Sequence, residues 1–505
     1  MNRQIFHLFI ILGLVLSLAG CTVGPNYHTP KTKVPDSFVG QASPPTDVPN
    51  QFAKWWTTLQ DPELDSLIER SVRGNLDLRL AQARVREARA QRGVVKADLF
   101  PIVNVSASYQ RSRRSRNVNI AQSGGGSQTT ATVDGDLYQA GFDASWEIDV
   151  FGGVRREVEA ANADLAAEIE NRRDVLVTLL AEVARNYVEL RASQRQTVIA
   201  RANLQAQQET LDLTRIRFSA GLVSDLDVAR AEAQVQTTAS QIPALEASAR
   251  QSIHLLSVLL GQEPNALTGE LAQDTPIPQS PPEIPVGLPS DLLRRRPDVR
   301  RAERELAVAT ARIGVATADL FPRFSLTGAL GLQSSKVNSL TNSGSRSWSI
   351  LPGVSWPVLD FGRIRSNIAV QNAREEQSLV LYEQTILTSL QEVEDALVSF
   401  SENQTQREKL AGAVDANRRA VDLANQLYKQ GLTDFLSVLQ VQRDLFASED
   451  ALVQTDRDIT SDFVALYKAL GGGWEMEASA TSEPPRGKAG DRVVDVSSLQ
   501  RQESP

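Results

Sequence analysis

Few residues of this 505-residue chain have the types and spacing that catalysis needs. The acids of Glu392–Asp395 lie within a coiled-coil-like apolar pattern, where surface charge is expected. His28 and His254 are far apart in the sequence, without a partner at metal-ligand spacing. The triplet Gly124–Gly126 is not followed by the Gly-Lys-Ser/Thr of a phosphate-binding loop. The sequence therefore predicts a protein that is not an enzyme and has no metal, nucleotide or other cofactor.

Cys21 is the only cysteine, and its surroundings predict lipidation. Arg3 precedes an apolar run, Ile5–Leu16, which is shorter than the roughly 20 residues of a membrane span. Leu18–Cys21 then resembles the bacterial lipobox, whose cysteine carries lipid and becomes the first mature residue. An ordinary signal peptide ending near a cysteine is the alternative. Because Thr22 replaces the aspartate that favours inner-membrane retention, we expect sorting to the outer membrane.

The charge distribution argues against nucleic acid as a partner. The formal net charge is −8, and the densest basic run, Arg111–Arg116, is short and poor in aromatic residues. Binding to a phosphate backbone needs a concentrated basic face. We interpret this run as the solvated end of a strand.

The pentapeptide Ala-Asp-Leu-Phe-Pro occurs twice, at 97–101 and 318–322. Each copy is followed by alternating apolar and polar residues, a polar gap, further alternation and Phe-Gly. A long stretch then follows that lacks proline and almost lacks glycine, Val154–Ala220 in the first half and Arg363–Gln430 in the second. This order predicts a tandem repeat.

Alternation of period two predicts four strands, at Val103–Tyr109, Tyr138–Ile148, Phe324–Leu332 and Trp348–Val358. Each approaches the 9–11 residues that a tilted strand needs to cross a bilayer. The aromatic residues that fit an interfacial girdle are Tyr138, Trp146, Trp348 and Trp356. A soluble sandwich is the alternative. Four strands cannot close a barrel, and open edges in lipid are costly, so membrane strands require several copies of the chain, and three would give twelve strands.

The long stretches predict helices of about 100 Å, far longer than the ~30 Å hydrocarbon core. Their apolar residues follow the alternating steps of three and four of a coiled-coil seam, at Leu176, Leu180, Val183, Tyr187 and Leu190, and again at Leu379, Tyr382, Ile386, Leu390, Val393, Leu397 and Phe400. Each stretch ends at Gly-Leu and is followed by a return helix, to Leu260 or Leu470. Each half therefore forms a helical hairpin with a glycine turn at its tip.

The predicted organisation has six parts. They are a signal peptide (1–20), an extended N-terminal segment that Trp55-Trp56 docks on the body (21–62), the first repeat (63–270), a Pro-rich linker (271–290), the second repeat (291–474) and a disordered tail (475–505).

The motifs together resemble the bacterial outer-membrane efflux proteins, which are TolC-like, and within them the NodT/OprM-like lipoprotein branch. The resemblance covers about residues 18–474. The motifs that carry it are Cys21–Tyr27, both Leu-Phe-Pro segments, Asp149–Gly152, Arg296–Val299 with Ala302-Glu303, and Tyr467–Gly472.

This resemblance implies a trimer with a twelve-stranded β-barrel, four strands per chain, continued by a long α-helical coiled-coil barrel in the periplasm. Such proteins are lipid-anchored exit ducts that passively conduct cargo from an inner-membrane pump of the resistance-nodulation-division class through a periplasmic adaptor. A type I secretion duct or a structural lipoprotein spanning the periplasm is the alternative. The adaptor would dock at the hairpin tips, Gly221, Leu222 and Val223, and Gly431, Leu432 and Thr433; plain turn chemistry is the other interpretation of these residues.

The resemblance also implies a closed iris near the tips. Asp227 and Arg230 match its positions in the first hairpin, and Tyr428 matches in the second. Ser437 and Gln440 stand where acids are common, which predicts a less charged, differently latched iris. A ring of Asp227 carboxylates would repel itself, favour cations and respond to pH. The alternative for Asp227 is a solvated helix charge.

Overall fold

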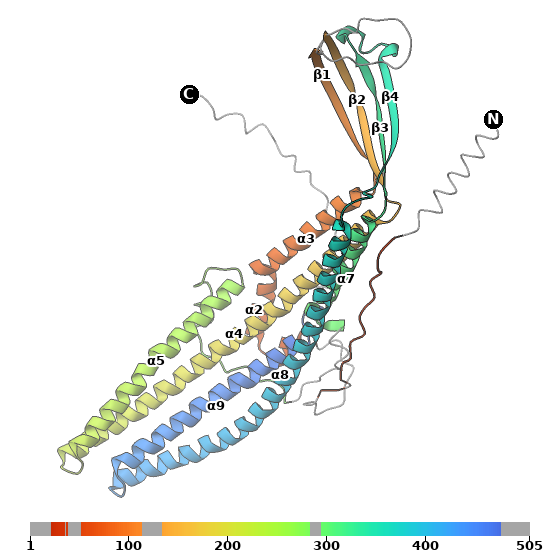
Figure 1. Ribbon diagram of the computed structural model, residues 1–505. Helices are drawn as coiled ribbons and strands as arrows, with labels where there is room; N and C mark the ends of the chain where they lie inside the picture. The colour runs from red at the N-terminus through yellow and green to blue at the C-terminus, as the bar shows by residue number, and fades with distance from the viewer. Residues whose placement is uncertain (1–21, 36, 39–51, 114–133, 283–293, 476–505) are drawn as a thin grey trace, which may run out of the picture.

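A computed structural model of the chain describes residues 22–35, 37–38, 52–113, 134–282 and 294–475. Cys21, the predicted signal peptide, the end of the predicted Pro-rich linker and the tail after 475 lie outside these ranges. A four-stranded sheet stands at one end of a long helical body (Figure 1). Two helical hairpins lie side by side and end in tips far from the sheet (Figure 1).

The sheet has the order β1-β2-β3-β4, and every neighbouring pair is antiparallel. The strands are β1 (Ile102–Arg113), β2 (Asp134–Ile148), β3 (Arg323–Ser334) and β4 (Arg346–Ser355). The four predicted strands are confirmed. Pro352 lies within β4, which forms one edge of the sheet, where a missing backbone donor is best tolerated.

The helices of the first repeat are α2 (Pro62–Gly74), α3 (Leu76–Ala97), α4 (Gly153–Ser219) and α5 (Asp225–Leu259). Those of the second are α7 (Pro297–Ala318), α8 (Arg363–Gln430) and α9 (Phe435–Ala469). Both long helices begin after a glycine with positive φ, 81° at Gly152 and 88° at Gly362, a backbone geometry that other residues rarely adopt. Within the described ranges, no helix is long and apolar enough to cross a membrane.

The largest core lies midway along the helical body. Trp55 and Trp56 are buried, and the Trp55 ring stacks on Tyr467 with a centroid distance of 5.5 Å. The first predicted seam, from Leu176 to Leu190, is buried in the same core. Docking of the tryptophans is thereby confirmed, but the N-terminal segment is not extended throughout. Residues Trp55–Leu59 form a 3₁₀ helix, η1, and both indole rings are buried from this turn.

Candidate functional site

The two hairpin tips share one turn geometry. Gly221 has φ of +73° and Gly431 of +77°. The N–H of Leu222 donates to the carbonyl of Arg217 at 2.9 Å, and that of Leu432 donates to Leu427 at 2.9 Å. This is the Schellman pattern, in which the residue after the glycine usually packs its apolar side chain back on the helix. Leu222 and Leu432 are instead exposed, with Val223 and Thr433 half-buried beside them. Each tip therefore presents a leucine to its surroundings.

The start of each return helix carries one carboxylate that caps the helix. In the first hairpin Asp227 Oδ2 accepts from the hydroxyl of Ser224 at 2.8 Å and from its N–H at 3.2 Å. In the second hairpin Asp434 Oδ1 accepts from the N–H of Ser437 at 2.9 Å. The serine and the aspartate therefore stand in opposite order in the two hairpins, at equivalent positions of the turn. Sequence reasoning found Asp227 and missed Asp434, although the Asp-x-x-Ser pattern is a helix-start signal.

The Asp434 carboxylate is held in its charged form by local hydrogen bonds. A bond from the Ser437 hydroxyl and another from the Ser437 backbone N–H lower the pKa of the Asp434 carboxyl. Arg230 and Gln440, one turn further along the two return helices, are exposed. Gln440 donates to Asp444 at 2.9 Å, whereas the Arg230 side chain has no hydrogen bond or ion pair among the described residues. The first hairpin therefore carries two carboxylates at the start of its return helix, Asp225 and Asp227, and the second carries Asp434.

Tyr428 joins the two hairpins. It is buried, and its hydroxyl is 3.2 Å from Thr214 Oγ1 on α4. The Arg217 guanidinium lies 4.5 Å from the centre of the Tyr428 ring and donates to its backbone carbonyl. A small apolar cluster surrounds the ring, formed by Leu211, Val228, Ala231, Val235, Phe435, Val438 and Leu439. We call Tyr428, Thr214 and Arg217 the tip latch.

The structure thus places Tyr428 against α4, and among the described residues it makes no hydrogen bond with Asp227 or Gln440. Sequence reasoning missed Thr214 and Arg217. The basic residue in the last turn of α4 was the one available signal, because cations are favourable at a helix C-terminus. Further from the tip, Gln442 Nε2 donates to Thr210 at 2.9 Å and Arg443 donates to Gln234 at 2.6 Å.

A buried arginine holds the N-terminal segment at the junction of sheet and helices. Arg156 is 3% exposed, and its guanidinium donates to the carbonyls of Val23 (3.0 Å) and Gly24 (3.2 Å) and to Asn26 Oδ1 (2.8 Å). Gly24 has φ of +85° and lies so close to Gly314 that a side chain on Gly24 would clash with it. We call these contacts the N-terminal socket. Cys21 lies outside the described residues, but its neighbour Thr22 contacts Gly152 near the base of the sheet.

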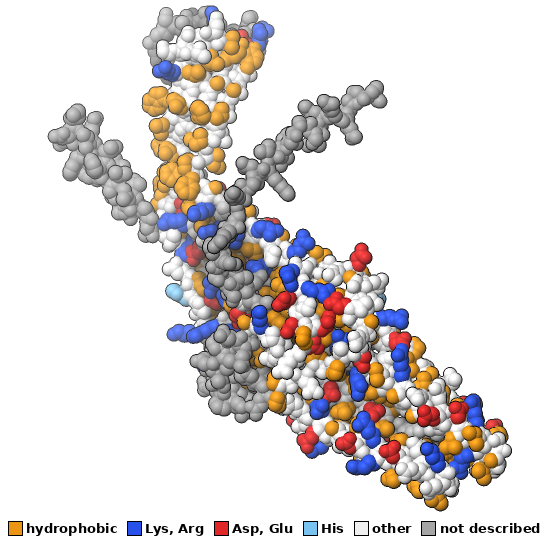
Figure 2. Space-filling model, turned by 180° about the vertical axis from the view of Figure 1, so that it is seen from behind, with side chains coloured by type: hydrophobic (Ala, Val, Ile, Leu, Met, Phe, Trp, Pro, Cys, Tyr) orange, Lys and Arg blue, Asp and Glu red, His pale blue; other side chains and the backbone are white. Residues whose placement is uncertain are grey.

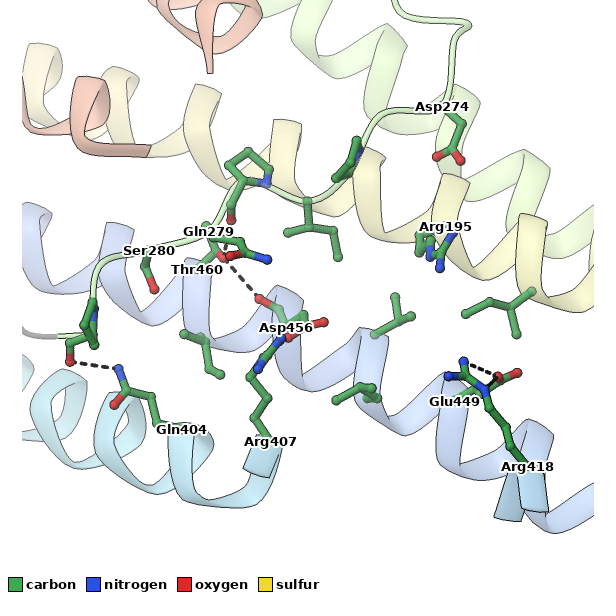
Figure 3. A pocket seen from close by; sticks show the side chains of 18 residues that line it. Arg195, Asp274, Gln279, Ser280, Gln404, Arg407, Arg418, Glu449, Asp456 and Thr460 are labelled. Carbon is green, nitrogen blue, oxygen red and sulfur yellow. Dashed lines mark hydrogen bonds and ion pairs between the residues drawn. The ribbon is translucent and has the colours of Figure 1, made fainter. Parts of the chain in front are cut away.

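One cavity lies between α4, α9 and the Pro-rich segment (Figure 3). Four of its charged side chains form ion pairs, Arg407 with Asp456 at 2.5 Å and Arg418 with Glu449 at 2.8 Å (Figure 3). The Pro-rich segment forms one wall, where Thr460 donates to Pro278 at 2.9 Å. Among the residues that the structure describes, no three His, Cys, Asp or Glu side chains are grouped to hold a metal ion.

Known proteins share this architecture over nearly the whole chain. The sequence pattern of the family described as "Outer membrane efflux protein" matches residues 67–262 and 288–472. Nodulation protein T of Rhizobium leguminosarum bv. trifolii is 32% identical over 467 residues, which are 92% of this chain and 97% of that protein. The pyoverdine export outer membrane protein OpmQ of Pseudomonas aeruginosa is 35% identical, over 85% of this chain and 89% of its own length.

The fold agrees with solved structures of the same kind. The outer-membrane channel OprN superimposes with a TM-score of 0.84 and 38% identity, covering 90% of this chain and all of that one. The open state of the MtrE outer membrane channel of Neisseria gonorrhoeae gives a TM-score of 0.77 and 28% identity, over 90% of this chain and 99% of that one. The chain belongs to the outer membrane efflux protein family, as a TolC-like outer-membrane channel of its NodT/OprM-like branch.

Proposed function

We propose that the protein is the exit duct of a tripartite efflux pump, in which three copies close a twelve-stranded barrel and a helical tunnel. The main support for this proposal comes from the sheet. Among the described residues its two edge strands, β1 and β4, have no further partner, and it exposes large apolar residues such as Val105, Trp348 and Val354. Apolar side chains follow the sheet, whereas charged ones gather on the helical body (Figure 2). Open edges in lipid leave backbone groups unsatisfied, so closure by further copies is required.

The helical body supports a duct that reaches into the periplasm. α4 has 67 residues, about 100 Å at 1.5 Å per residue. One relative is the solvent efflux pump outer membrane protein SrpC of Pseudomonas putida. We infer that an adaptor protein docks at the exposed leucines Leu222 and Leu432, and that an inner-membrane pump of the resistance-nodulation-division class delivers the cargo through it. Transport through the duct itself is passive.

Native mass spectrometry in non-denaturing detergent should give a particle of three chains. The reason is that a lone sheet of four strands cannot satisfy its edges in an apolar medium. A stable monomer that keeps its strand content in lipid, measured by circular dichroism, would contradict the proposed duct.

Arg156→Ala should release the N-terminal segment from its socket. The change leaves two backbone carbonyls and the Asn26 amide without their buried partner, and each such loss costs about 1–3 kcal/mol. We expect hydrogen exchange of residues 22–35 to accelerate roughly tenfold or more. Arg250→Ala, at an exposed arginine, is the matched control and should leave this exchange unchanged.

Cys21→Ser tests the contribution of the lipid separately from that of the N-terminal socket. It should weaken anchoring in membrane flotation, since one lipid anchor is lost, while the exchange of residues 22–35 stays slow. Equal loss of protection in Cys21→Ser and Arg156→Ala would show that the socket does not hold the segment by itself.

A further inference from the structure

One face of α3 carries three basic side chains. Arg86, Arg89 and Lys96 are separated by steps of three and seven residues, which place them on one side of a helix. All three are exposed, and among the described residues none of them has a hydrogen bond or an ion pair. We call these residues the basic stripe.

The equivalent positions of the second repeat are neutral. α3 and α7 both have 22 residues and both end at the repeated pentapeptide, so their residues correspond one to one. The residues of α7 that correspond to the basic stripe are Ala307, Thr310 and Thr317. Ala307 and Thr310 are buried. The charge of the stripe therefore belongs to α3 and is not a general feature of the repeat.

The N-terminal segment lies against this face of α7. The Tyr27 hydroxyl donates to Glu303 Oε1 at 3.0 Å, and Gly24 lies in close contact with Gly314. The residue of α3 that corresponds to Gly314 is Gly93, which lies between Arg89 and Lys96. Within the described part of the chain, a Cβ on Gly93 would meet no neighbouring atom within 4 Å. The face that is covered on α7 is therefore open on α3.

The acidic residues around the end of α3 lie elsewhere. Asp98, Glu147, Glu157 and Asp319 line a hollow between the base of the sheet and the helices, and the basic stripe does not contribute to its lining. Arg323, which also lines this hollow, pairs with Asp319 at 2.5 Å. The carboxylates in the hollow therefore do not neutralise the stripe.

The basic stripe begins directly below the apolar base of the sheet. α3 ends at Ala97 and β1 begins at Ile102, and Phe100 between them is exposed. Trp146 donates its indole N–H to the carbonyl of Leu99 at 3.1 Å, which holds this turn against the sheet. Lys and Arg side chains lie just below the apolar band of the sheet (Figure 2). A bilayer presents its hydrocarbon core and its headgroups in the same order.

The length of the stripe matches the depth over which headgroup charge acts. Lys96 and Arg86 are ten residues apart, about 15 Å along the helix at 1.5 Å per residue. A headgroup layer is about 5–8 Å thick, and charges are screened over about 8 Å at physiological ionic strength. Since α3 slants away from the base of the sheet, the depth of Arg86 is smaller than this length (Figure 1). All three cations therefore lie within reach of the headgroup charge.

The helix by itself does not account for the stripe. Lys96 lies in the last turn of α3, where a cation is favourable to the helix dipole. Arg86 and Arg89 lie more than two turns from this end, and like charges three residues apart repel one another. α3 has six basic and two acidic residues, whereas α7 has four and three. An external anion would remove this repulsion.

We propose that the basic stripe binds anionic phospholipids, in the leaflet of the outer membrane that faces the helical body. This inference rests on the proposed placement of the sheet in the membrane, and it names the class of lipid that surrounds the duct. The guanidinium and ammonium groups donate to phosphate oxygens of the headgroups. Gly93 leaves room for a headgroup close to the helix backbone. The stripe selects lipids by their charge, because attraction to an anionic surface adds up over the basic residues near it.

Lipid preference of the full chain in vesicles tests the proposal, with spin-labelled phosphatidylglycerol and phosphatidylcholine as the two probes. The unchanged channel should bind phosphatidylglycerol several fold more strongly. The triple variant Arg86→Gln, Arg89→Gln, Lys96→Gln should bind the two lipids about equally, since glutamine keeps the helix but removes the charge. High salt should reduce the preference of the unchanged channel and have little effect on the triple variant.

A second triple variant is the matched control. Arg185→Gln, Arg195→Gln, Arg419→Gln removes the same charge from exposed positions of α4 and α8 that lie far from the sheet. It should keep the preference for phosphatidylglycerol. The conservative variant Arg86→Lys, Arg89→Lys should keep it as well, because the charge is unchanged. Millimolar inorganic phosphate should not abolish the preference, and its loss would assign the stripe to free anions instead.

The outcomes separate this proposal from the proposed duct. The lipid site is overturned if the unchanged channel shows no preference, if the stripe variant keeps it, or if the control variant loses it equally. Each of these results leaves the duct intact as long as the proteins are trimeric and conduct ions in planar bilayers. A chain that does not insert into vesicles overturns the duct and the lipid site together.

Discussion

Tyr428→Ala should open the channel, giving an open probability in planar bilayers that is higher by roughly tenfold or more. The tyrosine ring is buried between the hairpins, and truncating a buried aromatic residue costs about 3–5 kcal/mol. The change also removes the hydroxyl contact with Thr214 and the ring contact with Arg217, both of which join α8 to α4 near the tip. A ratio of open to closed states shifts tenfold for each 1.4 kcal/mol.

The control for this variant is Tyr428→Phe, which keeps the ring and loses only the hydroxyl contact with Thr214. One hydrogen bond contributes about 0.5–1.5 kcal/mol, so the open probability should rise only a few fold. Arg217→Ala should lie between the two. If Tyr428→Ala forms trimers with an unchanged open probability, the tip latch does not hold the channel shut.

Exchange of Ser224 and Asp227 should separate the capping role of Asp227 from its proposed role in the iris. Asp227→Ala removes both the cap and the charge, and we expect a higher single-channel conductance and a first return helix less stable by about 0.5–2 kcal/mol. The double variant Ser224→Asp, Asp227→Ser copies the arrangement of Asp434 and Ser437 in the second hairpin. It keeps a cap but moves the carboxylate by three residues.

The double variant decides between the two roles. If the carboxylate ring at position 227 sets the closed state, the exchange should raise conductance and weaken cation selectivity, much as Asp227→Ala does. If Asp227 acts only as a cap, the channel of the double variant should behave like the unchanged one. Asp227 would then have no role in the iris. Hydrogen exchange of residues 225–235 measures the cap in both variants.

Local patterns were enough to predict most of the fold. The four strands follow from alternation of period two, and the seam of α4 follows from apolar steps of three and four. The tips follow from Gly221 and Gly431, since a helix that reverses needs a residue at positive φ. These features depend on interactions between residues that are only a few positions apart, so the pattern of residue types along the sequence is enough to predict them.

The candidate site was predicted less completely. The sequence singled out Asp227, Tyr428, Gln440 and the glycine turns, but not Arg217, Thr214 and Asp434, which contact Tyr428 or cap the second return helix. Gln440 is exposed and donates to Asp444. Tyr428 and Thr214 are 214 positions apart in the chain. No local period indicates which side chains meet across two hairpins.

By itself the sequence determined the duplication, the two periods and the single cysteine that follows a short apolar run. The tertiary structure alone decided which faces of the repeats are covered, how Arg156 seats the N-terminal segment, and which residues latch the tips. The physical reason is the distance along the sequence between the residues that interact. A helix or strand is specified by neighbours along the chain, whereas the partner of a buried guanidinium or of a bare apolar face is specified only once distant elements pack together.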